Sequence, residues 1–155
     1  MPVEFLHPLK AIIFILLMVV LVPKAEIRRL AGYGLLFGSV YDVIGLTIGH
    51  LTKAFSWINF GRFGYGYLPL DSPISWCAFY IMYFYLMPKH KPLIYLFPIS
   101  GVVMSMIYSR VLVNFGMFDE PDSFLLRVAN FSVWFTYATW GYLKLNRYIE
   151  RKHAN

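Results

Sequence analysis

Long apolar runs separated by short polar stretches are the main pattern along this chain of 155 residues. Five apolar segments can be distinguished, at residues 8–22, 30–52, 72–87, 93–115 and 123–145. A helix that crosses a bilayer needs about 20 mostly apolar residues. The second, fourth and fifth segments reach that length, and the first and third approach it with their apolar flanks. The pattern therefore predicts an all-α integral membrane bundle of five transmembrane helices in a single domain.

The charged residues between these segments predict how the bundle is oriented. Cytoplasmic loops carry an excess of Lys and Arg. The basic residues gather in the first connection, the third connection and the C-terminal tail: Lys24, Arg28 and Arg29; Lys89 and Lys91; Arg147, Arg151 and Lys152. Five spans would place these three regions on one side, opposite the acidic stretch 119–122. We therefore expect the N-terminus outside and the C-terminus in the cytoplasm.

The longest connection, residues 53–71, reads KAFSWINFGRFGYGYLPLD and is rich in glycine and aromatic residues. Aromatic rings are enriched where a membrane meets water. The composition predicts that this connection lies on the membrane surface or folds back over the bundle.

Composition supports a membrane location and argues against other partners. The chain is 59% hydrophobic and only 14% charged, whereas soluble domains carry about 25% charged residues. The net charge of +6 comes from short clusters beside apolar runs, which is typical of membrane flanks and not of a nucleic-acid-binding stripe. The bilayer itself is the expected partner, and no nucleic acid is expected.

Cysteine and histidine give no sign of a metal or cofactor site. Cys77 is the single cysteine, and no Cys/His pair has zinc-ligand spacing. There is no phosphate-binding loop, nucleophile elbow or dinucleotide fingerprint. We expect no cofactor and no metal, and we interpret His7, His90 and His153 as solvated flanks. Lys10 is expected to extend its amine to the membrane interface.

The second segment contains an acid, Asp42, within the apolar stretch YGLLFGSVYDVIGLTIGHL. At about 100° per residue, three glycines lie within about 60° of Asp42 on the helix. Two small-x-x-x-small patterns, which allow close helix packing, are formed by Gly34, Gly38, Gly45 and Gly49. We therefore predict that Asp42 faces protein, where it is either protonated or paired with Arg110 or Arg127.

Other polar residues are expected to converge with Asp42 on the outer half of the bundle. Arg127, Asn130 and Trp134 share one helix face, as do Arg110 and Asn114. The hypothesis is an outward-facing polar pocket for a lipid-like or small ligand, comprising Asp42, His50, Arg62, Asp71, Arg110, Asn114, Arg127, Asn130 and Trp134. The alternative is that these residues tie helices together through hydrogen bonds and ion pairs.

The order of features resembles a family of small, uncharacterised multi-helix membrane proteins of spore-forming Gram-positive bacteria. The shared features are a basic turn, Asp42-x-x-Gly45 in a helix, an aromatic loop, and Leu68-Pro69 before the next helix. The likeness covers about residues 26–148. It implies a multi-pass protein of the bacterial cytoplasmic membrane and assigns no activity.

A second stretch, Pro69-Leu70-Asp71-Ser72, is similar to the Pro-x-Glu-Glu motif of the membrane lycopene cyclase domain. Here Asp71 replaces the first glutamate and Ser72 the second. The resemblance implies an isoprenoid or lipid enzyme in which Asp42 and Asp71 act as general acids.

Three functional hypotheses follow from these observations. The first is a noncatalytic bundle that binds a lipid-like or small ligand, or serves as an accessory membrane subunit. The second is the cyclase-type enzyme. The third is a small transporter, oligomeric because five helices are few, in which Asp42 titrates. The expected partners are the bilayer, a lipid or isoprenoid ligand, and a second copy or another membrane protein.

Overall fold

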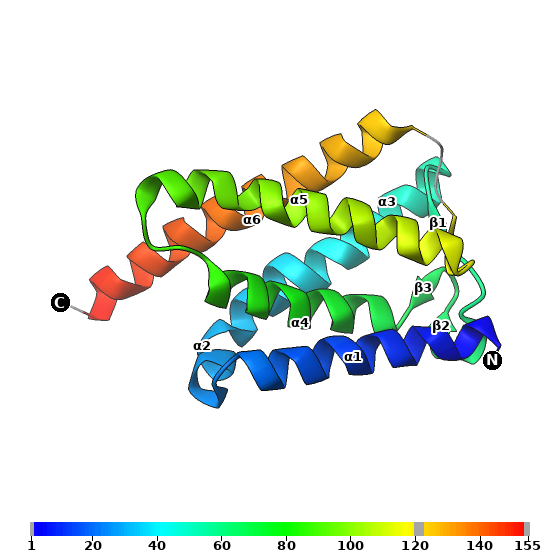
Figure 1. Ribbon diagram of the computed structural model, residues 1–155, viewed down its shortest axis with the longest axis horizontal. Coiled ribbons are helices and arrows are strands. Elements are labelled where there is room, and N and C mark those ends of the chain that lie inside the picture. The colour runs from blue at the N-terminus through cyan, green and yellow to red at the C-terminus, as the bar shows by residue number, and fades with distance from the viewer. Residues whose placement is uncertain (1, 120–122, 154–155) are drawn as a thin grey trace. The chain divides into compact units, whose positions relative to one another are not determined.

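The computed structural model describes residues 2–119 and 123–153, and this part of the chain is mostly helical (Figure 1). Its helices are α1 (Leu6–Leu21), α2 (Lys24–Gly34), α3 (Tyr41–Thr52), α4 (Asp71–Leu86), α5 (Lys91–Asn114) and α6 (Phe124–His153). A π-helical segment, η2 (Leu35–Val40), joins α2 to α3 without a break, so the described residues form five continuous helices. The all-α class is confirmed.

Short elements complete the chain. They are the 3-10 turns η1 (Val3–Phe5) and η3 (Gly61–Phe63) and the two-residue strands β1 (Ser56–Trp57), β2 (Gly64–Tyr65), β3 (Leu68–Pro69) and β4 (Phe118–Asp119). β1 pairs with β4 and β2 pairs with β3, both antiparallel.

Three of the helical stretches in the described residues are long and apolar enough to cross a membrane: Val3–Leu21, Lys24–Thr52 and Lys91–Asn114. Two boundaries differ from the prediction, because the second helix begins at Lys24 and the last one continues to His153. Both extensions are charged, and Lys, Arg and Glu are good helix formers. Charge marks where a helix leaves the bilayer, not where its hydrogen bonding ends.

The chain forms two compact units. Unit 1 comprises Met1–Leu86 and Tyr108–Asp122, and unit 2 comprises Met87–Ile107 and Ser123–Asn155. In unit 2, Gly101 on α5 directly faces the ring of Phe135 on α6. The small residue lets the two helices approach closely there.

Helix α4 is the centre of unit 1. It runs beside α1, and α2 also packs against it (Figure 1). Its side chains are buried around most of its circumference, including Trp76, Ala78, Tyr80, Ile81, Met82, Tyr83 and Phe84. A helix that is apolar all round is one that neighbours surround, which explains why this sequence has no amphipathic period.

The glycine row contacts α4 at only one end. A Cβ on Gly34 would lie 2.6 Å from the Ile81 side chain, and one on Gly38 would lie 2.5 Å from the Trp76 carbonyl oxygen. Beyond this point, no helix among the described residues packs against Gly45 or Gly49. A Cβ on Gly45 would meet nothing within 4 Å among the described residues, and Gly49 faces the Phe55 ring instead of a helix. The reason is that α4 begins at Asp71, level with Asp42, so α3 extends past its end.

Residues 54–70, which we call the cap, follow α3. The helix ends because Lys53 turns left-handed, at φ 55°, and the Ala54 N–H donates to the Gly49 carbonyl at 3.0 Å. The cap then pairs with β4, and the Ile58 N–H donates to the Met117 carbonyl at 3.1 Å. Its strands lie at the end of unit 1 that holds the N-terminus (Figure 1). The cap therefore folds back over this end of unit 1, and its placement on a membrane surface stays a prediction.

Candidate functional site

Five polar side chains meet beneath the cap, and we call them the polar cluster. His7 and Lys10 come from α1, Asp42 from α3, and Asp71 and Ser72 from the start of α4. Their exposed fractions are 0%, 8%, 6%, 4% and 0%, respectively. Charged groups are almost never this buried unless they are paired, so the cluster is the most unusual chemistry in unit 1.

Local helix geometry brings these residues together. His7 and Lys10 are three residues apart, so both point from the same face of α1. Asp71 occupies the first turn of α4, where the helix dipole favours a negative charge. The Ser75 hydroxyl donates to the Asp71 carbonyl at 2.7 Å, which adds a hydrogen bond to this turn.

Asp71 is the centre of the cluster. Its Oδ2 lies 2.5 Å from the Lys10 ammonium, and its Oδ1 lies 3.2 Å from His7 Nδ1. The Lys10 ammonium also lies 3.8 Å from the centroid of the Trp57 ring in the cap, a cation–π contact. These contacts favour the carboxylate form of Asp71, which has no proton to donate, so they give no support to a general-acid role.

Asp42 has weaker contacts than Asp71. The Ser72 hydroxyl lies within hydrogen-bonding reach of its carboxyl, and Lys10 is the nearby positive charge. Its Oδ2 is buried, and no described residue gives it a hydrogen bond of good geometry. Within unit 1 the positive charge near Asp42 is therefore Lys10 and not the predicted Arg110. The predicted pairing with Arg127, which belongs to unit 2, stays a prediction.

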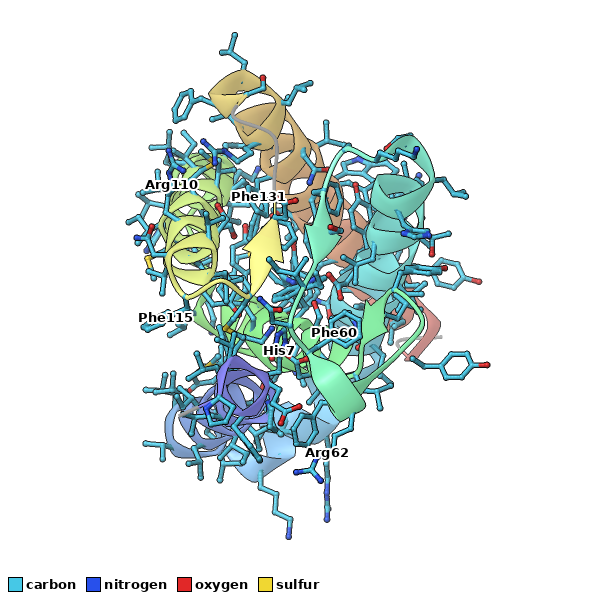
Figure 2. All side chains as sticks on the ribbon, turned by 90° about the vertical axis from the view of Figure 1, so that its right-hand side faces the viewer. His7, Phe60, Arg62, Arg110, Phe115 and Phe131 are labelled. Atoms are coloured by element: carbon cyan, nitrogen blue, oxygen red, sulfur yellow. The ribbon has the colours of Figure 1, made fainter. Side chains whose placement is uncertain are left out.

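His7 joins the cluster to the cap. Its Nδ1 faces the Asp71 carboxylate, and its Nε2 lies 3.2 Å from the Ile58 carbonyl oxygen. Both partners are acceptors, and only the doubly protonated imidazolium can donate from both nitrogens. Trp57 and Phe60 pack edge-on against the His7 ring, at centroid distances of 5.5 and 6.0 Å. Figure 2 shows His7 and Phe60 in the interior of this end of unit 1.

The other residues predicted for a pocket in unit 1 do not join the cluster. His50 is exposed and stacks on Tyr67, with ring centroids 4.4 Å apart. Arg62 projects outward from the cap beside the rings of Phe5 and Phe63 (Figure 2). Arg110 and Asn114 are exposed on α5. Only Asp42 and Asp71 are brought together.

The remaining predicted residues belong to unit 2. Arg127 and Trp134 are buried on α6, whereas Asn130 is exposed. Their burial follows the seven-residue spacing of one α6 face, which is typical of helix packing.

Sequence reasoning missed His7 and Lys10. The interpretation of His7 as a solvated flank and the expectation that Lys10 reaches the interface are both wrong, because both side chains are buried. Their spacing of three at the start of an apolar helix was the available signal. The sequence did not show that these side chains are buried, because the cap that covers this end of α1 comes from a distant part of the chain.

Within the described residues, no group of three or more His, Cys, Asp or Glu side chains is arranged to hold a metal ion. No protein family, curated protein or solved structure matches this chain. The site must therefore be interpreted from its own chemistry.

Proposed function

We propose that this chain is a five-span integral membrane protein, N-terminus outside and C-terminus cytoplasmic, whose polar cluster binds and releases a proton and thereby controls the cap. The resemblance described above supports a bacterial cytoplasmic membrane as its location. The three long apolar helices support the membrane assignment. The short α4 is consistent with a fourth span because its neighbours in unit 1 shield it from lipid.

The observation that carries this proposal is that both ring nitrogens of His7 face acceptors. Neutral histidine would direct a lone pair at either the Asp71 carboxylate or the Ile58 carbonyl. Loss of the proton therefore weakens one of the two bonds. The bond to Ile58 is one of the contacts that hold the cap to α1.

Charge balance supports the same proton. A buried cluster is stable when its charges cancel. With both carboxyls ionised, Asp42 and Asp71 carry two negative charges against the one positive charge of Lys10. Protonated His7 completes the balance. Among the described residues, the hydroxyls of Ser72 and of Tyr108 on α5 also face the cluster, and neither changes this count.

The direction of the response follows from these contacts. At lower pH the imidazolium bonds both acceptors, and the cap is held. As pH rises and His7 loses its proton, the cluster becomes negative and the cap is released.

Amide hydrogen exchange of residues 54–70 in lipid nanodiscs tests the proposal. We expect cap protection, corrected for the intrinsic pH dependence of exchange, to fall as pH rises. His7→Gln should make the corrected protection independent of pH.

The controls are two exposed histidines. His90→Gln, on the α4–α5 connection, should keep the wild-type transition. His50 stacks on Tyr67 within the cap, so His50→Gln tests whether His50 binds the proton in place of His7. If the transition disappears in His50→Gln and persists in His7→Gln, the proton is not at His7 and the proposal is wrong.

The ligand-binding and enzymatic hypotheses are weaker proposals on this geometry. A lipid-like or small ligand would need the polar groups to line a shared space, yet His50, Arg62, Arg110 and Asn114 are exposed on unit 1. A cyclase would need an acid that donates its proton, and the contacts of Asp71 favour its carboxylate.

A further inference from the structure

Helix α6 is longer than a membrane is thick. Its 30 residues span about 45 Å at about 1.5 Å per residue, whereas the hydrocarbon core measures about 30 Å. If α6 crosses the bilayer as proposed above, about ten residues extend beyond it. Those residues lie at the C-terminal end, where the sequence becomes basic.

Five side chains share one face of this end of α6. Relative to Lys144, and at about 100° per residue, Trp140, Arg147, Tyr148 and Arg151 all lie within about 60°. All five are exposed, with fractions of 57% for Trp140 and 66% for Tyr148. We call these residues the basic–aromatic face.

The Lys144 cation of this face lies against an aromatic ring. Its ammonium is 4.6 Å from the centroid of the Trp140 ring, which orients it without neutralising its charge. Among the carboxylates whose side chains the structure describes, none pairs with Lys144, Arg147 or Arg151. In contrast, Arg29 at the start of the second helix is paired with Glu26 at 2.6 Å. The first basic connection is therefore partly neutralised by Glu26. The third connection contains only two basic residues, Lys89 and Lys91.

We propose that the basic–aromatic face binds the headgroups of anionic phospholipids in the cytoplasmic leaflet. This inference rests on the proposed membrane insertion and not on the proton-binding role of the cluster. Charge complementarity argues for an anionic ligand, since basic residues beside a membrane helix attract anionic lipid. The rings argue for a lipid, because Trp and Tyr favour the headgroup level of the bilayer.

Native mass spectrometry of the detergent-solubilised chain tests the preference, with equal amounts of phosphatidylglycerol and phosphatidylcholine added. We expect the wild type to retain phosphatidylglycerol in preference to phosphatidylcholine. The variant Lys144→Gln/Arg147→Gln/Arg151→Gln should lose at least about fivefold of that preference, which is the effect expected from a single basic residue near an anionic surface. The matched control, Lys24→Gln/Arg28→Gln/Lys89→Gln, removes three exposed cations elsewhere and should keep most of it.

Two results would overturn the inference: an unchanged preference in the α6 variant, or an equal loss in the control. A second measurement covers membrane insertion itself. In proteoliposomes, the part of the tryptophan fluorescence that is lost in Trp140→Phe should be quenched more by brominated phosphatidylglycerol than by brominated phosphatidylcholine. Equal quenching by both lipids overturns the lipid preference alone. No quenching by either lipid overturns the insertion of α6 as well.

Discussion

At the scale of single residues, the polar cluster shows how a membrane bundle accommodates charge. An isolated charge near a bilayer centre costs about 2.5–3.5 kcal/mol on insertion scales. Lys10, Asp42 and Asp71 reduce that cost by meeting each other inside unit 1. Each therefore depends on its neighbours: Lys10 pairs with Asp71, lies over the Trp57 ring and is the nearby positive charge for Asp42.

Removal of Lys10 should accordingly have a large effect. Lys10→Met keeps a long apolar stem but leaves two buried carboxylates without their cation. We expect a loss of about 3–5 kcal/mol in the free energy of unfolding, measured by denaturant titration in detergent micelles. Lys24→Met, at an exposed position on α2, is the matched control and should change stability by less than about 0.5 kcal/mol. If Lys10→Met lowered the free energy of unfolding as little as Lys24→Met, the Lys10 contacts would contribute nothing to stability.

At the scale of elements, the second helix is divided into two parts by the end of α4. Gly34 and Gly38 lie where α4 is present, and Gly45 lies beyond its first residue. The π-helical segment Leu35–Val40 contains Gly38 and ends before Gly45. Such segments are rare and frequently occur at functional sites, and this one immediately precedes Tyr41 and Asp42.

Alanine substitution should separate these two parts. Gly38→Ala would place a Cβ 2.5 Å from the Trp76 carbonyl oxygen, so we expect a loss of about 1–3 kcal/mol from overpacking. Gly45→Ala has open space around it and should stabilise the helix by about 0.5–1 kcal/mol. Thermal unfolding of the two variants in the same detergent measures both signs. A stabilising Gly38→Ala would contradict the close contact with α4.

At the scale of the whole molecule, the number of spans decides where each connection lies. Five spans with the N-terminus outside place the α4–α5 connection in the cytoplasm and the stretch after α5 outside. If only the three long apolar helices span, these two positions are exchanged, although the C-terminus stays cytoplasmic. Fusion at the C-terminus therefore cannot distinguish five spans from three.

Reporter fusions at His90 and Asp119 make that distinction. We expect an alkaline phosphatase fusion after His90 to be inactive and one after Asp119 to be active, because the enzyme is active only outside the cytoplasm. A green fluorescent protein fusion should give the opposite pattern at each site. Activity after His90 combined with inactivity after Asp119 would mean that α4 does not cross the membrane.

The sequence by itself determined the features that depend on local pattern. Apolar runs of membrane length predicted the helices to within a few residues at most boundaries, and the spacing of Gly34 and Gly38 predicted a close helix contact. Asp42 was predicted to face protein because glycines share its face of the helix, and its side chain is buried. These inferences need only the helical period and the thickness of a bilayer.

Only the tertiary structure decided what these residues meet. Lys10 and Asp71 are 61 positions apart in the sequence, and His7 meets the carbonyl of Ile58. Periodicity assigns a residue to a face of its own helix but does not say which distant segment covers that face. The cap covers His7 and Lys10, and the end of α4 leaves Gly45 uncovered. Both outcomes depend on where a second element stops, which no local pattern encodes.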